Sequence, residues 1–298
     1  MKPAPFEYHR PTTTDEVTDL LADLPDAKLM AGNQSFGIIM SNRLATPDDV
    51  IDLNEVEELR YIDVSETAVE LGAMARHADI EHSEELAEVM PLLPAEAHHI
   101  AGPAVRNRGT VGGTLGEADP AGNHSCALLA LGADIELASA DGTRTVPVSE
   151  YFLAYMLTAD EDDELITSVR ISREPFPVDR TGMAFEIEKQ AAQTWPTLGT
   201  STVVRVDDPD AAAPTIEDVR LSFANASDVP LRTAAAESEA EGEPLSPGLL
   251  ESVSDIVYDA VEPQDEMHAD ETYKRELAAT FAKRSIETAY QGAVDGGD

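Results

Sequence analysis

Residues 106–120 read RNRGTVGGTLGEADP and place four glycines between positions 109 and 116. Glycine lets the main chain take positive φ and pass close to a ligand, which we expect at Gly109, Gly112 and Gly113. Thr110 and Thr114 add hydroxyl groups to the same turn. Backbone N–H groups presented by such a turn suit an oxygen-rich ligand, most readily a phosphate. The stretch matches neither G-x-x-x-x-G-K-[ST] nor G-x-G-x-x-G, so a nucleotide held here would be held in another fold.

A second glycine-bearing turn lies upstream, where residues 29–37 read LMAGNQSFG. A short apolar run leads into Ala31, Gly32 and Asn33, which is typical of a strand that ends in a tight turn. Glycine and asparagine both tolerate the left-handed region of backbone conformation. Either turn alone could be an ordinary surface turn, so the argument for a ligand rests on finding the two together.

Composition points to a large globular chain. The 298 residues, 42% of them hydrophobic, can bury a sizeable core and predict two domains. The sequence has no apolar run of about 18 residues and no secretory signal, so we expect a cytoplasmic protein without a transmembrane segment. Cys126 is the single cysteine. It excludes an internal disulfide and any cysteine-ligated iron–sulfur or zinc site within this chain.

The formal net charge is −38, from 58 acidic and 20 basic residues. Phosphate would be repelled by this field, so nucleic acid is excluded as a partner. The acidic residues are spread among apolar ones rather than gathered in a tail. This pattern is typical of a protein from a high-salt cytoplasm, where screening shortens the reach of repulsion to about 3 Å at 1 M salt. An acidic mesophilic protein is the alternative.

Hydrophobic periodicity predicts a helix after Thr13, which has capping-box spacing with Glu16. It also predicts a helix at residues 80–89, interrupted by Pro91 and Pro94, and one at residues 126–131 closed by Gly132. Alternating or buried runs predict strands at residues 28–30 (buried), 48–53, 68–73, 134–138, 165–171, 184–189, 202–206 and 219–223. Residues 172–180 are expected to form a linker, with further helices at residues 248–261 and about 270–290.

These features together resemble the flavin-binding medium subunit of the molybdenum hydroxylases, the family of aerobic carbon monoxide dehydrogenase and xanthine dehydrogenase. The resemblance rests on the turn at residues 31–35 and, more specifically, on the turn at residues 106–113. It extends to residues 43–47, 118–121, 128–133 and 185–189, and covers nearly the whole chain. The chain departs from the family at Asn33, where a second glycine is usual. Asparagine can still adopt positive φ at modest cost.

The resemblance implies an α+β protein. A two-subdomain α/β FAD-binding domain (PCMH-like) would span residues 1–175, with subdomains at about residues 1–55 and 56–175. A smaller α+β C-terminal domain, with a short antiparallel sheet and helices, would span residues 180–290 and cover the flavin.

The resemblance also implies which residues contact the cofactor. An aromatic residue of the C-terminal domain covers one face of the flavin in this family, and Trp195 stands where a tyrosine is usual in the carbon monoxide branch. Lys189 could offset charge on reduced flavin or form a surface salt bridge. For Asp119, contact with the ribityl group and a local Asx turn are both open. The full expected set is Ala31, Gly32, Asn33, Gln34, Ser35, Thr110, Val111, Gly112, Gly113, Thr114, Asp119, Lys189 and Trp195.

No residue stands out as a general acid, base or nucleophile, and the seven histidines show no metal-ligand spacing. We therefore expect neither a catalytic side chain nor a metal site in this chain. The resemblance implies an FAD subunit that takes electrons from iron–sulfur clusters of a small subunit, after a molybdopterin-binding large subunit has oxidised the substrate. The acceptor would be a quinone, NAD or oxygen, and the complex could associate with a membrane. The alternatives are a self-contained FAD oxidoreductase of the same flavin fold and a cofactor-free assembly or binding protein.

Overall fold

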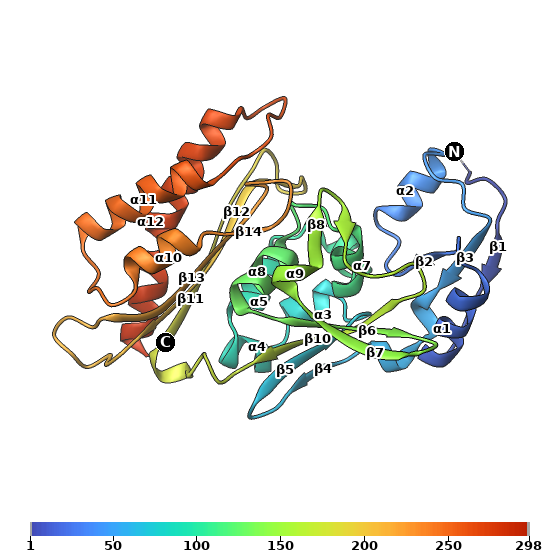
Figure 1. The fold of residues 1–298 in the computed structure, drawn as a ribbon, viewed down its shortest axis with the longest axis horizontal. Coiled ribbons are helices and arrows are strands. Elements are labelled where there is room, and N and C mark those ends of the chain that lie inside the picture. The colour runs from blue at the N-terminus through green and yellow to red at the C-terminus, as the bar shows by residue number, and fades with distance from the viewer. Residues whose placement is uncertain (1, 297–298) are drawn as a thin grey trace.

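The computed structural model describes residues 2–296 and arranges them as three lobes in a row (Figure 1). The N-terminal lobe, drawn in blue, lies at one end. A middle lobe of strands and short helices follows, and a lobe of long strands and helices, drawn in yellow to red, lies at the other end. Helices and strands are mixed in all three lobes, so the α+β class expected from the sequence is confirmed.

The first lobe is a small parallel sheet with helices. It contains β1 (Glu7–His9), α1 (Thr14–Asp23), β2 (Lys28–Met30), α2 (Phe36–Ser41) and β3 (Asp49–Asp52), followed by the 3-10 turns η1 (Leu53–Glu55) and η2 (Glu57–Leu59). The strands lie in the order β1-β3-β2, with β3 parallel to both neighbours. The strand at residues 28–30 is exposed or half-buried rather than buried, because β2 lies at the edge of this sheet.

Helix α1 begins as its sequence predicts. The Thr13 hydroxyl accepts from the N–H of Glu16, which is the expected N-cap bond. The Glu16 carboxylate, however, accepts from Thr12 rather than from Thr13, so the reciprocal half of the capping box is shifted by one residue. Val17 and Leu21 of the helix pack on Ile51 of β3 in the core of this lobe.

The middle lobe has a five-stranded sheet in the order β4-β5-β10-β6-β7, antiparallel at every pairing. Its short helices α3 to α8 lie between β5 and β6 in the chain. The elements are β4 (Ile62–Val64), β5 (Ala68–Gly72), α3 (His77–Glu81), α4 (Glu84–Val89), α5 (Leu92–His98), α6 (Pro103–Arg106), α7 (Val111–Glu117), α8 (Asn123–Leu131), β6 (Asp134–Ser139), β7 (Gly142–Pro147), α9 (Val148–Tyr151), β8 (Phe152–Ala154), β9 (Leu157–Thr158) and β10 (Leu165–Ser172).

The single helix expected at residues 80–89 is wrong, because the chain forms two helices there. Ser83 has an extended backbone and its hydroxyl accepts from the N–H of Leu86, so it starts α4 afresh. Pro94 does not interrupt a helix either, since it lies in the first turn of α5. A proline is tolerated there because the N–H groups of a first turn have no partner within the helix.

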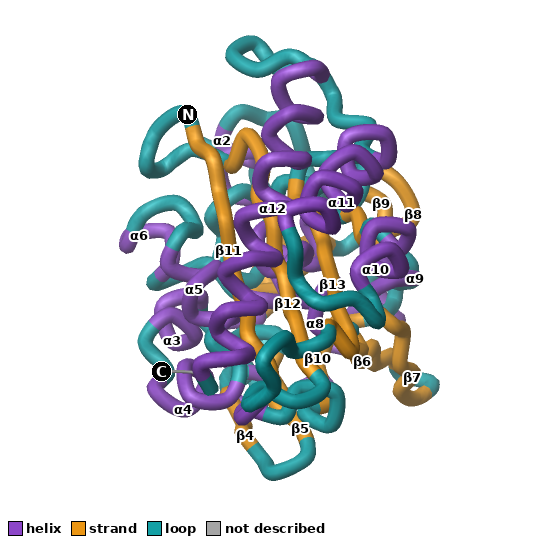
Figure 2. The backbone as a smooth tube through the Cα atoms, turned by 90° about the vertical axis from the view of Figure 1, so that its left-hand side faces the viewer, coloured by secondary structure: helices purple, strands orange, loops and turns teal. Residues whose placement is uncertain are grey.

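The third lobe is a four-stranded antiparallel sheet with three helices. Its elements are η3 (Val178–Arg180), β11 (Thr181–Lys189), β12 (Pro196–Val206), β13 (Ile216–Ala224), β14 (Leu231–Arg232), α10 (Ala234–Ala240), α11 (Pro247–Ala260) and α12 (Glu271–Asp295). The sheet order is β11-β12-β13-β14. Helix α12 lies across β11 and β12 (Figure 2), at a distance that only glycine permits: a Cβ on Gly182 would collide with the backbone of Ala289.

Helix α8 joins the middle lobe to the third. All nine of its residues are buried, and it contacts α5 on one side and β12 and β13 on the other. Gly132 ends it with a φ of 63°, as the sequence predicts. Among the helices of residues 2–296, none has the length and apolarity that crossing a bilayer requires.

Candidate functional site

The two glycine-bearing segments, the first at residues 29–37 and the second at residues 106–120, lie against each other. A Cβ on Gly32 would collide with the carbonyl of Arg108 and would lie 2.8 Å from the Cα of Gly109. A Cβ on Gly113 would lie 3.6 Å from the Cβ of Ala31. The fold thus brings together two segments far apart in sequence, and the missing side chain of Gly32 is what lets their backbones meet.

The first segment offers free backbone donors. Within residues 2–296, the N–H groups of residues 32–35 have no hydrogen-bond acceptor. Asn33 has a φ of 59°, as expected for a residue that replaces glycine here. Its Oδ1 atom is buried and also lacks a partner among the described residues. Successive unpaired amides around a left-handed residue form a concavity that suits anionic oxygen.

Side chains hold this segment in shape. The Gln34 side chain donates to the carbonyl of Gly32 at 2.8 Å, and Asn54 donates to the carbonyl of Ala31 at 3.0 Å. Arg76 in turn donates to the Asn54 side chain at 2.7 Å and to the carbonyl of Arg108. Because Arg76 bonds partners of both segments, it couples the position of one to that of the other.

The second segment differs from the loop that its glycines suggest. Thr110 is an N-cap whose hydroxyl accepts from the N–H of Gly113 at 3.1 Å, and α7 begins at Val111. The N–H groups of Val111 and Gly112 donate to the carbonyls of Ala75 and Ala73, at 3.1 and 2.8 Å. The expected positive φ at Gly109, Gly112 and Gly113 is therefore wrong, since positive φ among the described glycines occurs elsewhere.

These internal bonds change the role of the second segment. The amides of Val111, Gly112 and Gly113 are occupied by protein acceptors, so the freely available donors belong to residues 32–35. Thr114 is half-buried in the first turn of α7, where its N–H donates to the carbonyl of Thr110. The second segment acts chiefly as a rigid wall against which the first one lies.

Two carboxyl groups follow this wall. Asp119 accepts from the N–H of Ala121 at 2.9 Å, which is the Asx turn considered from the sequence. Burial raises its pKa, although the Ala121 bond opposes the shift. Glu117, which the sequence analysis did not single out, also has its pKa raised by burial, with the Ser35 hydroxyl opposing. Both carboxyls are thus easier to neutralise than exposed ones.

Trp195 and Lys189 border the loop between β11 and β12. Trp195 is 52% exposed, so it is not a core aromatic. The Lys189 amine donates to the carbonyls of His99 and Ala192, at 2.7 and 2.8 Å, and forms no salt bridge with a described carboxylate. Burial, aided by the charge of Arg106, lowers the pKa of Lys189. Lys189 therefore ties this loop of the third lobe to the residues that precede α6.

A buried polar chain, missed by the sequence analysis, supports the second segment. The Nδ1 atom of His77 lies 2.8 Å from Nε2 of His124, and the other ring nitrogen of His124 contacts the Glu96 carboxyl. A Cβ on Gly109 would lie 2.5 Å from Nε2 of His77. Burial lowers the pKa of His124 to about 3 and lowers that of His77, while it raises the pKa of Glu96.

Arg106, which flanks the glycines, is committed elsewhere. It is buried, and its guanidinium donates to both oxygens of Glu81 at 2.6 and 3.1 Å. A third bond reaches the carbonyl of Ile100 at 3.0 Å. Such a bidentate pair fixes the arginine as a structural group rather than as a phosphate ligand.

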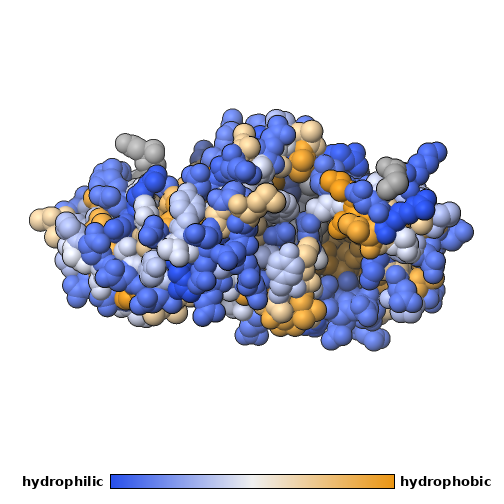
Figure 3. Space-filling model, turned by 90° about the horizontal axis from the view of Figure 1, so that it is seen from above, coloured by the Kyte–Doolittle hydropathy of each residue, from blue (hydrophilic) through white to orange (hydrophobic). Residues whose placement is uncertain are grey.

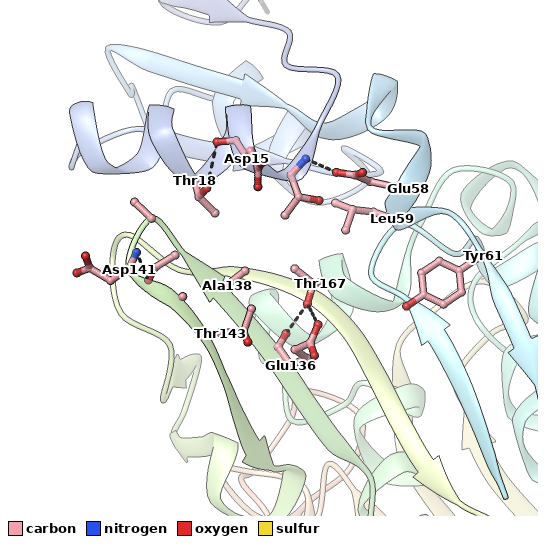
Figure 4. Close-up of a pocket in the computed structure, with 14 residues that line it drawn as sticks. Asp15, Thr18, Glu58, Leu59, Tyr61, Glu136, Ala138, Asp141, Thr143 and Thr167 are labelled. Carbon is pink, nitrogen blue, oxygen red and sulfur yellow. Dashed lines mark hydrogen bonds between the residues drawn. The ribbon is translucent and has the colours of Figure 1, made fainter.

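A separate cleft of about 540 Å³ opens between the first two lobes (Figure 4). Four carboxylates line it, those of Asp15, Glu58, Glu136 and Asp141. None of the residues expected to bind the cofactor lies in its wall. Because these carboxylates repel a diphosphate, the glycine segments remain the better candidate for an anion site.

Comparison with known proteins identifies the family. Residues 4–174 match the family model described as FAD binding domain in molybdopterin dehydrogenase. Residues 183–289 match the model described as CO dehydrogenase flavoprotein C-terminal domain.

Relatives match over nearly their full length. The carbon monoxide dehydrogenase medium chain of Hydrogenophaga pseudoflava is 32% identical over 97% of this chain and 99% of that protein. The xanthine dehydrogenase FAD-binding subunit of Escherichia coli O157:H7 is 28% identical over 96% of each chain.

Solved structures agree. A chain of the Hydrogenophaga pseudoflava carbon monoxide dehydrogenase that lacks the Mo-pyranopterin moiety superposes with a TM-score of 0.92, at 33% identity over 98% of this chain and 99% of that one. A chain of reconstituted CO dehydrogenase from Oligotropha carboxidovorans gives 0.92 at 28% identity, over 98% of this chain and 99% of that one. The chain therefore belongs to the FAD-binding medium subunits of the molybdenum hydroxylase family of oxidoreductases.

Proposed function

We propose that this chain transfers electrons through FAD within a molybdopterin-dependent dehydrogenase. The free amides of residues 32–35 would bind the diphosphate of FAD, with the second glycine segment behind them. The observation that supports this best is the run of unpaired N–H groups beside Asn33, pressed against Gly109. The residues present fit the cofactor, because main-chain donors around a glycine can approach a diphosphate closely.

Each of the remaining expected site residues has a separate proposed role. Val111, Gly112, Gly113 and Thr114 shape the wall of the diphosphate site, and the half-buried Asp119 accepts from a hydroxyl of the cofactor. Trp195, on its exposed loop, covers the flavin ring, and Lys189 holds that loop in place. We assign these roles from position and burial.

Bound flavin would accept electrons singly and release them in pairs, and the protein's part is to position the cofactor and to tune it. The electrons would come from iron–sulfur clusters of a small subunit, after a large subunit with molybdopterin has oxidised the substrate. They would leave to a quinone, NAD or oxygen. The name "medium chain" carried by relatives supports a complex of several subunits. We place it in the cytoplasm of a cell with high internal salt.

Flavin binding by the purified chain tests the proposal. In Gly32→Ala, the new Cβ would collide with the Arg108 carbonyl and separate the two segments. We expect FAD affinity, measured by flavin fluorescence titration in high salt, to fall about tenfold or more. The matched control is Gly248→Ala, since a Cβ on that glycine of α11 meets nothing within 4 Å. Circular dichroism checks that both variants fold.

Three results would contradict the proposal. A wild-type chain that cannot be loaded with FAD would favour a cofactor-free binding protein. A yellow chain that oxidises a substrate alone would favour a self-contained oxidoreductase. Equal FAD affinity in wild type and Gly32→Ala would move the diphosphate to another place.

A further inference from the structure

The β8–β9 hairpin, residues 152–158, carries apolar side chains into solvent. Leu153 and Tyr155 are each 59% exposed, Leu157 is 55% exposed and Met156 is 44% exposed. These are four of the eleven large hydrophobic residues that are exposed anywhere in residues 2–296. Seen from above, the molecule shows a few separate apolar patches, the larger ones at and to the right of the middle, on a face that is otherwise mostly hydrophilic (Figure 3). A run of exposed apolar residues is typical of an interaction site.

The hairpin is held at its base and free at its tip. Phe152 packs on the core of the middle lobe and on the ring of buried Tyr151, 5.2 Å away between centroids. The carbonyl of Tyr151 accepts from the N–H of Ala159 at 2.9 Å. Beyond this base, β8 and β9 pair only with each other and join no larger sheet. Two strands alone gain little stability in water, so the tip is suited to being covered by another surface.

The turn at the tip of the β8–β9 hairpin places an apolar residue, Met156, where a polar residue or glycine is usual. Met156 has a φ of 52°, a left-handed conformation that glycine or asparagine usually takes at a tip. A polar or glycine residue would satisfy this geometry at lower conformational cost and without exposing apolar surface. A methionine here favours contact, because its flexible thioether adapts to the surface that it meets.

Charge beside the hairpin selects the kind of occupant. Residues 160–164 read DEDDE and follow β9 directly, and Glu161, Asp162 and Asp163 are exposed. A second copy of the chain would bring two such acidic runs into direct contact, at a separation that salt does not screen, and an anionic lipid surface or nucleic acid would set its phosphates against the same carboxylates. A protein surface with an apolar pocket edged by Lys or Arg would bury the apolar tip and pair its positive charges with the acidic run.

We propose that the β8–β9 hairpin docks this chain onto another subunit of its oxidoreductase complex, by inserting Tyr155, Met156 and Leu157 into an apolar pocket with a basic rim. This inference rests on the proposed function for the existence of the complex. It assigns the contact to one hairpin, which carries none of the expected FAD-binding residues.

The test uses the full chain, co-expressed with its neighbouring subunits and purified in high salt. Tyr155→Ser combined with Leu157→Ser removes apolar surface without adding charge. We expect the affinity for the partner subunit, measured by biolayer interferometry, to fall about tenfold or more. The FAD content and the melting temperature of the isolated chain should stay as in wild type. The control is Val178→Ser, which removes an apolar side chain that is 44% exposed in η3, outside the hairpin.

Each outcome decides the inference separately from the cofactor proposal. Unchanged partner affinity in the double variant would overturn the docking role, whatever its FAD content. A melting temperature lowered in the double variant but not in Val178→Ser would show that the tip stabilises the chain itself, and would also overturn it. So would a homodimer that sedimentation detects in wild type and not in the double variant, because the occupant would then be a second copy. Loss of FAD from the wild-type chain with partner binding intact would overturn the cofactor proposal alone.

Discussion

Nε2 of His124 lies 2.8 Å from Nδ1 of His77, and both rings are buried beneath the glycine segments. One ring must donate in this bond and the other must accept. Because burial keeps both imidazoles neutral, the Glu96 carboxyl, which contacts the other ring nitrogen of His124, sets which tautomer His124 takes. A protonated Glu96 would donate to His124, leaving the Nε2–H of His77 directed at Gly109.

The first prediction concerns the pH dependence that Glu96 imposes. Burial raises its pKa in the folded protein above the ordinary value of 4.5. A raised pKa contributes stability that is complete below the unfolded value and is lost as pH rises towards the folded value. Glu96→Gln cannot ionise, so its advantage in stability over wild type should grow as the pH rises above 4.5, the ordinary value for this carboxyl. Denaturant midpoints across this range measure it.

The histidines provide the internal control for Glu96→Gln. The lowered pKa values of His77 and His124 contribute stability that is present above about pH 6.5 and is lost as the pH falls below that value. This acid limb should persist in the variant. A constant difference between wild type and Glu96→Gln at all pH values would mean that the buried carboxylate stays ionised beside a protonated histidine.

The second prediction concerns Thr110, the N-cap of α7. Thr110→Ala removes the acceptor of the Gly113 N–H, which should cost about 1 kcal/mol of stability. It should also weaken FAD binding, because α7 supports the first glycine segment. The matched control is Ser246→Ala, which removes the equivalent N-cap bond to Leu249 in α11. If both variants lose stability and FAD affinity equally, the position of Thr110 has no special relation to the cofactor.

The third prediction uses Trp195, the only tryptophan of the chain. Since this indole is half-exposed on its loop, its fluorescence reports that loop alone. FAD bound beneath it should quench the emission, and Trp195→Phe should abolish the signal while retaining the flavin. Emission that does not change as FAD saturates the chain would remove Trp195 from the site.

The fourth prediction concerns salt. A net charge of −38 repels itself in the folded state, and screening is weak at low ionic strength. The melting temperature should therefore rise steeply as potassium chloride is increased from low to molar concentration. A charge-neutral osmolyte at equal osmolality serves as the control and should not reproduce the rise. Equal stability across the salt series would exclude adaptation to a high-salt cytoplasm.

Local chemistry made part of this fold predictable. The cap of α1 at Thr13, the left-handed Asn33 and the left-handed end of α8 at Gly132 all depend on residues within one turn of each other. The α+β class came instead from the family resemblance, and the structure confirms it. The domain boundaries near residue 175 and the roles of the expected site residues stay predictions.

Other features depended on partners distant in sequence. Helix α7 was missed because glycines are poor helix formers, whereas the carbonyls of Ala73 and Ala75 hold its first turn in place. The buried pair of His77 and His124 joins positions 47 residues apart, which no spacing rule detects. The apolar tip at Tyr155 gave no sequence signal either, since a short apolar run predicts burial rather than exposure.

Helix α8 has a consequence for how this gene can be cut or recombined. Its buried residues contact helix α5 of the middle lobe and the β12–β13 sheet of the third lobe, and the Ser222 hydroxyl of β13 donates to the Cys126 carbonyl within the second contact. A fragment that ends before β11 would expose to solvent the side of α8 that packs on β12 and β13. A fragment that begins at β11 would lack α8, the helix that covers this face of its sheet. Exchange of either half between relatives therefore succeeds only when α8 travels with a matching β12–β13 surface.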